Sequence, residues 1–157
     1  MPFRPFFQWC DTLAIANAVR NSRFIFPIVE SIHILALAVL LGTVIVFGAR
    51  LLGLGLKQRP VDDVYRSLSG MRDCALLTLI VTGFLLFCSE AMKCYDSPPF
   101  WAKMIALFAA VLFQYTVVQW AGRKAPARGS VRAIATATLS LLLWFSVGAA
   151  GRAIGFY

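Results

Sequence analysis

The residues best able to do chemistry are polar and ionisable side chains that lie inside or beside long apolar segments. Glu30 and His33 stand within the first apolar segment, and their spacing of three places them on one face of a helix. Lys103 and Gln114 are eleven residues apart, about three helical turns, so they also share a face. Because ionisable groups are costly inside a membrane, each is a candidate functional residue.

Two more charges, Glu90 and Arg152, stand at the ends of later apolar segments. If neighbouring helices run antiparallel, all of these positions meet at one end of a bundle. We therefore expect an outward-facing polar pocket with the following lining: Glu30, His33, Glu90, Lys103, Arg152 and Gln114. A purely structural alternative is that the two glutamates neutralise Lys103 and Arg152 and so hold the helices in register.

His33 is the basis for two cofactor predictions. With Glu30 it could hydrogen-bond a quinone, or its imidazole could ligate the iron of haem b while Lys103 or Arg152 faces the propionates. The chain has a single histidine, so a second haem ligand would be Met92, Met104 or the equivalent histidine of a second subunit.

Soft metal ligands gather near the same end of the expected bundle. Thiolate and thioether groups favour Cu(I), and imidazole suits copper, zinc and iron. We therefore name four candidate metal ligands: His33, Met92, Met104 and Cys94. Their spacing matches no recognised metal motif. In an oxidising compartment, Cys10 and Cys94 could form a disulfide instead.

The elements that must position these residues are membrane helices. The chain has 157 residues, of which 60% are hydrophobic and 14% charged, and its mean hydropathy is +0.77. This composition excludes a soluble enzyme, a disordered chain and a disulfide scaffold. Four segments are long and apolar enough to cross a bilayer: about 24–54, 74–91, 101–120 and 131–150. We expect one all-α integral membrane domain over residues 1–157, built as a four-transmembrane-helix bundle.

The first 23 residues form a separate element. They mix aromatic and polar side chains and lack the uninterrupted apolar core of a signal peptide. We expect an amphipathic helix over about residues 5–21 that lies on the membrane surface, with a partly disordered N-terminus as the alternative.

The distribution of Lys and Arg predicts the orientation. The loops after the first and third spans, with their flanks, hold nine of these residues, and the other side holds six. The positive-inside rule then places both termini outside the cell membrane. Most of the net charge of +8 is explained in this way, so we expect no nucleic-acid partner.

Several motifs resemble a known family. They are P-x-x-E-S-x-H at Pro27–His33, R-L-L-G at Arg50–Gly53, F-x-x-K at Phe100–Lys103 and G-R-x-I-G-F at Gly151–Phe156. The pattern is similar to an uncharacterised family of small bacterial four-helix inner-membrane proteins, itself distantly similar to the membrane domain of CopD-type copper-resistance proteins. This resemblance implies the four-helix fold, a bacterial inner membrane location, and the importance of Glu30, His33, Arg50, Lys103 and Arg152. In that membrane, the orientation predicted from Lys and Arg places both termini in the periplasm. It implies no reaction, and the chain has fewer histidines than a copper channel would need.

Three functions follow from these observations. The first is a subunit of a membrane redox or electron-transfer assembly that binds haem or quinone at His33. The second is a copper-binding or small-solute transport protein, and the third is a purely structural subunit of a larger complex. The sequence shows no nucleophile elbow, phosphate-binding loop or paired histidines, so we do not expect an enzyme acting alone. The expected partners are the lipid bilayer and other membrane subunits or further copies of this chain.

Overall fold

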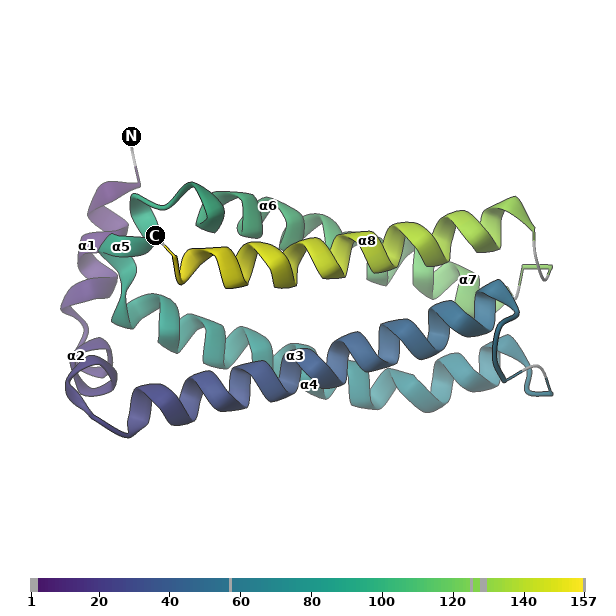
Figure 1. Ribbon diagram of the computed structural model, residues 1–157, viewed down its shortest axis with the longest axis horizontal. Coiled ribbons are helices and arrows are strands. Elements are labelled where there is room, and N and C mark those ends of the chain that lie inside the picture. Colours follow the sequence, from purple (N-terminus) through teal and green to yellow (C-terminus); the bar gives the residue numbers. More distant parts are fainter. Residues whose placement is uncertain (1–2, 57, 125, 128–129, 157) are drawn as a thin grey trace.

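The computed structural model describes residues 3–56, 58–124, 126–127 and 130–156. Within these residues the chain is helical and contains no strand. Four long helical segments run side by side as a bundle (Figure 1). They are α3 (Ile25–Leu52), α4 (Val61–Ser89), the run Pro98–Lys124 and α8 (Val131–Ile154). Each is long and apolar enough to cross a membrane, so the expected all-α four-helix bundle of a multi-pass membrane protein is confirmed.

Local sequence signals set the ends of these helices. α3 ends at Gly53, whose φ of 75° is the left-handed conformation that glycine adopts at low cost. Pro60 precedes the first residue of α4, and α6 (Pro98–Phe113) carries proline in its first turn. α8 begins after Ser130, whose hydroxyl oxygen accepts a hydrogen bond from the Ala133 amide.

The third span is not a uniform α-helix. It consists of α6, a π-helical segment η1 (Gln114–Val118) and α7 (Gln119–Lys124). A π segment inserts extra residues into one turn and is frequently found at functional sites.

The second span begins earlier than the expected range of 74–91. α4 starts at Val61 because the segment before Cys74 is amphipathic, with Val64, Tyr65 and Leu68 on its bundle-facing side. Arg72, one of the nine Lys and Arg residues expected in the two basic loops and their flanks, therefore lies on a membrane-spanning helix.

Three short helices lie across one end of the bundle, which we call the terminal end because both termini are found there (Figure 1). They are α1 (Arg4–Thr12), α2 (Ala14–Asn21) and α5 (Ala91–Tyr95). The single surface helix expected over residues 5–21 is thus two helices, separated by the extended backbone of Leu13. Their buried face docks on the bundle through an aromatic cap formed by Phe7, Phe87, Tyr95, Phe100 and Trp101.

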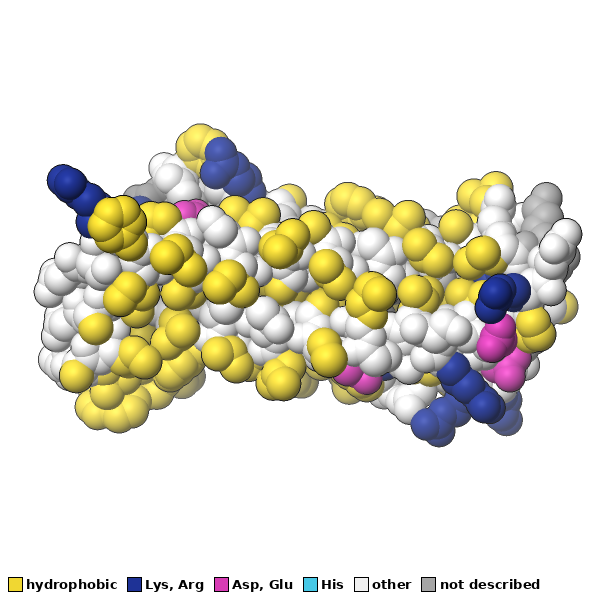
Figure 2. All heavy atoms as spheres, turned by 90° about the horizontal axis from the view of Figure 1, so that it is seen from below, with side chains coloured by type: hydrophobic (Ala, Val, Ile, Leu, Met, Phe, Trp, Pro, Cys, Tyr) yellow, Lys and Arg dark blue, Asp and Glu magenta, His cyan; other side chains and the backbone are white. Residues whose placement is uncertain are grey.

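The bundle is thin, so most span surface faces outward. Between 22% and 33% of the residues in the most apolar part of each span are buried, and Figure 2 shows apolar side chains along the outside of the molecule. α3 packs against both α4 and α8, and α8 packs against α6. α4 meets the third span mainly through α7. This contact lies at the end of the bundle opposite the terminal end, which we call the loop end.

Candidate functional site

The imidazole of His33 is held by a chain of hydrogen bonds from α4. Its Nδ1 lies 2.8 Å from the hydroxyl oxygen of Thr82, and the Thr82 hydroxyl donates to the carbonyl of Thr78 at 2.6 Å. Because the hydroxyl has only one proton to donate, its oxygen must accept from His33, which assigns the proton to Nδ1. The other ring nitrogen, Nε2, therefore carries a free lone pair.

Two glycines make room for the side chains of this site. A Cβ atom at Gly83 would lie 3.2 Å from Cε1 of His33, so the ring packs directly against the backbone of α4. A Cβ atom at Gly151 would lie 3.5 Å from Nζ of Lys103, so the lysine packs against the backbone of α8. Lys103, like His33, lies within about two helical turns of the terminal end of its span.

These five residues form what we call the His33 cluster: His33, Thr82, Gly83, Lys103 and Gly151. They come from all four spans, one or two helical turns inside the terminal end. In the part of the chain that the structure describes, no carboxylate forms an ion pair with Lys103. The cluster therefore has an imidazole lone pair on α3 and an ammonium group on α6 at similar depths near the terminal end of the bundle.

The other charges of the expected pocket lie elsewhere. Glu30 is exposed on α3, and Glu90 at the end of α4 lies 3.8 Å from Lys93. Arg152 is exposed, with its guanidinium 5.3 Å from the ring centre of Phe156. Among the described residues, neither glutamate is paired with Lys103 or Arg152, so the ion pairs of the structural alternative are not formed.

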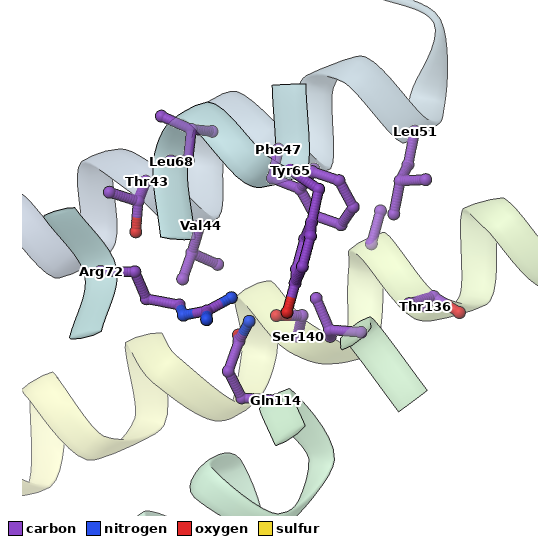
Figure 3. A pocket seen from close by; sticks show the side chains of 13 residues that line it. Thr43, Val44, Phe47, Leu51, Tyr65, Leu68, Arg72, Gln114, Thr136 and Ser140 are labelled. Carbon is purple, nitrogen blue, oxygen red and sulfur yellow. The ribbon is translucent and has the colours of Figure 1, made fainter. Parts of the chain in front are cut away.

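Gln114 belongs to a different site. Its side chain is buried, and its Oε1 accepts a hydrogen bond from Trp144 Nε1 at 3.4 Å. It faces a small cavity nearer the loop end, together with Tyr65, Arg72 and Ser140 (Figure 3). The cavity volume of about 20 Å³ is room for about one water molecule.

Arg72, which was not among the residues expected in a functional site, supplies the charge at this cavity. Its guanidinium lies 5.1 Å from the ring centre of Tyr65 and 5.3 Å from that of Tyr115. Its Nε donates to Asp73 at 2.9 Å, and the Tyr115 hydroxyl donates to the same carboxylate oxygen at 2.7 Å. The signal was present in the sequence, because Arg72 follows Leu68 and Tyr65 at helical spacing on the apolar face of α4.

Arg50, which the family resemblance pointed to, has a structural role in this arrangement. Its side chain is buried, and its Nε and Nη2 donate to the carbonyl of Arg59 at 2.9 and 2.6 Å. These two bonds tie the end of α3 to the segment that leads into α4.

The structure disperses the four candidate metal ligands. Met92 packs against the aromatic cap, Met104 is exposed, and Cys94 is buried. Burial, helped by the nearby charge of Glu90, raises the pKa of Cys94 to about 11, which keeps it a thiol and a poor metal ligand at neutral pH. Of residues 3–56, 58–124, 126–127 and 130–156, no three His, Cys, Asp or Glu side chains gather where they could hold a metal ion.

The cysteines are not arranged as the disulfide alternative expected. All four are free thiols, and Cys10, Cys88 and Cys94 are buried in the same apolar cluster at the terminal end. Burial raises the pKa of Cys10 above its usual value. Apolar packing, and not a covalent bond to Cys94, therefore holds this part of α1 against the end of α4.

Comparison with known proteins gives one match. The family model described as "Family of unknown function (DUF6644)" matches residues 6–157, nearly the whole chain. No curated protein and no solved structure matches the chain. The coverage of all four spans and of the terminal helices shows that the protein belongs to the family of unknown function DUF6644.

Proposed function

We propose that this protein is a subunit of a redox or electron-transfer assembly in a bacterial inner membrane, and that its His33 cluster binds the headgroup of a quinone. The observation that carries the proposal is the hydrogen-bond chain from Thr78 through Thr82 to His33, which leaves Nε2 as an acceptor. Lys103, whose ammonium is paired with no carboxylate of the described residues, would supply the donor. One acceptor and one donor are what a quinol hydroxyl and a quinone carbonyl require.

The residues of the cluster fit a quinone better than a haem. A bound quinone supplies two-electron redox chemistry, and the protein has only to hold its oxygens and exchange protons with them. Nε2 of His33 can take a proton from a quinol hydroxyl, while Lys103 stabilises the oxygen that becomes negative. Haem b would need a second ligand from another subunit, such as its equivalent histidine, because Met92 lies in the aromatic cap and Met104 is exposed.

A copper-handling role, which the distant CopD similarity raises, has weaker support. His33 is a fit ligand because its Nδ1 proton is donated to Thr82, an arrangement common among metal-binding histidines. Its sulfur partners are dispersed, however, and Cys94 stays protonated. Copper would therefore need further ligands from another subunit.

The proposed orientation places the terminal end in the periplasm. An even number of spans brings both termini to one side, in agreement with Figure 1. The Lys and Arg count of nine to six favours a cytoplasmic loop end. The His33 cluster then lies in the outer half of the bilayer.

Replacing Thr82 by valine tests the hydrogen-bond chain. We expect Thr82→Val to weaken binding of a short-chain ubiquinone to the purified protein by about tenfold, since loss of one hydrogen bond that orients the imidazole costs about 1.4 kcal/mol. Calorimetric titration in detergent measures the affinity. The matched control is Thr78→Val, because Thr78 contributes only its backbone carbonyl to the chain and its own hydroxyl bonds to the Cys74 carbonyl.

Other results from the titration, from visible spectra and from metal analysis would contradict the quinone proposal. Equal ubiquinone affinities for the wild type and both variants would show that the His33 cluster does not bind quinone. A reduced-minus-oxidised spectrum with a Soret and an α band would replace quinone by haem, and about one copper atom per chain would favour the metal alternative. A His33→Ala protein that folds and binds ubiquinone normally would show that His33 does not form the quinone site.

Gly83 provides a second test of the same cluster. In Gly83→Ala the new Cβ would lie 3.2 Å from Cε1 of His33 and push the ring away from Thr82. We expect ubiquinone affinity to fall by about fivefold, less than on loss of the whole hydrogen bond. Gly70→Ala on the same helix is the control, because nothing lies within 4 Å of its Cβ position. Equal affinities for the two variants would show that the ring position does not govern binding.

A further inference from the structure

An open groove at the terminal end is separate from the His33 cluster. It lies between α2, the first turn of α3 and the end of α4, and its volume is about 330 Å³. Its lining includes Arg20, Arg23, Phe26, Pro27, Ser89 and Glu90. His33 stands about two helical turns deeper on α3 than Phe26, so the groove is closer to the membrane surface than the quinone site proposed above.

One wall of the groove is fixed by Arg20. Its Nε donates to the carbonyl of Ser89 at 2.8 Å, and its Nη2 pairs with the carboxylate of Asp11. These contacts hold α2 against the end of α4. The groove is therefore built by interactions between elements that are distant in sequence.

The charges that face the groove are of both signs. Arg23 is exposed, and none of the acidic side chains that the structure places forms an ion pair with it. Glu90 brings a carboxylate to the same groove, where its recorded partner is Lys93 at 3.8 Å. Two guanidinium groups and one carboxylate are complementary to a zwitterion that carries an anionic group and an ammonium group.

The surroundings of the groove are those of a lipid-binding site. Apolar side chains at the start of α3 and directly before it are exposed: Phe24, Ile25 and Ile28. They continue the outward-facing apolar surface of the span, along which acyl chains would lie. A headgroup in the groove would therefore have its chains on the lipid-facing side of α3.

We propose that this groove binds the headgroup of phosphatidylethanolamine, with its phosphate at Arg20 and Arg23 and its ammonium at Glu90. A primary ammonium donates hydrogen bonds to a carboxylate, whereas the trimethylated ammonium of phosphatidylcholine has no N–H to donate. Phosphatidylglycerol lacks the cation altogether. The groove thus distinguishes lipids by the group beyond the phosphate.

Native mass spectrometry of the full chain, released from micelles that contain equal amounts of the three phospholipids, tests the proposal. We expect the wild type to retain phosphatidylethanolamine about tenfold over phosphatidylcholine, the worth of one charge-assisted hydrogen bond. Glu90→Gln should abolish this preference, and Arg23→Gln should reduce retention of all three lipids. Arg4→Gln, at an exposed arginine of α1 outside the groove, is the matched control and should behave as the wild type.

Two results would overturn the proposal. One is equal retention of the three lipids by the wild type, and the other is an unchanged lipid preference in Glu90→Gln together with undiminished retention of all three lipids by Arg23→Gln. Soluble O-phosphoethanolamine, added as a competitor, separates a lipid site from a solute site. If it displaces the lipid at equal concentration, the acyl chains contribute nothing and the groove takes a free zwitterionic solute instead.

Discussion

Gly122→Ala is expected to lower the free energy of unfolding by about 1–3 kcal/mol, the usual cost of overpacking a filled core. Gly122 is buried on α7, and a Cβ atom there would lie 2.4 Å from Cγ and 2.5 Å from Cδ2 of Tyr65. Such distances are impossible for real atoms, so the tyrosine ring or α7 must move. Equilibrium unfolding in mixed micelles measures the difference.

The effect should reach the cavity at Arg72. The Tyr65 ring packs against Phe47, with ring centres 5.4 Å apart, and against the guanidinium of Arg72. Displacing the ring disturbs both contacts. Gly70→Ala again serves as the control, because its Cβ meets nothing within 4 Å. A Gly122→Ala protein as stable as Gly70→Ala would show that α7 does not pack on Tyr65 as described.

Arg50→Met is expected to lower the free energy of unfolding by about 2–3 kcal/mol. The substitution keeps much of the apolar stem but removes two hydrogen bonds from a buried guanidinium to the carbonyl of Arg59. Hydrogen bonds that involve a charged group are each worth about 1.5–3 kcal/mol, and the buried stem of methionine recovers part of that loss. The same unfolding experiment gives the value.

Arg59→Met is the matched control for this prediction. The Arg59 side chain is exposed and lies 3.4 Å from Asp63, an ion pair of a kind worth less than about 1 kcal/mol. Its backbone carbonyl, which Arg50 binds, is unchanged by the substitution. Equal stability losses for Arg50→Met and Arg59→Met would place the importance of Arg50 outside this loop contact.

The four spans could be predicted from the sequence because length and apolar composition alone define a segment that can cross a bilayer. The start of α4 could not be found in that way, since its first turns are amphipathic and contain several charges. The apolar residues of these turns lie on one side of the helix and can be recognised in the sequence. They indicate a buried helix face only when the helix that packs against it is known. Arg72 was therefore taken for a loop charge, although it lies on that face.

The residues expected in one pocket lie at different places in the structure for a related reason. Residues three apart on a helix differ by about 60° around its axis. His33 can therefore face the bundle while Glu30 lies just outside the contact edge. Lys103 and Gln114 do share a helix face, but they are separated by about 16 Å along the axis and serve different sites. Spacing gives the relative angle of two residues, whereas their depth and orientation depend on neighbouring helices.

The small buried share of each span has a consequence for how this sequence can change. With at most a third of the residues in each apolar window buried, most span positions are constrained only to remain apolar. Leucine, isoleucine, valine and phenylalanine can replace one another there without changing the bundle. We therefore expect family members to differ more at the lipid-facing positions of the spans than at inward-facing residues such as His33, Arg50, Arg72 and Lys103. An alignment of family members would test this expectation.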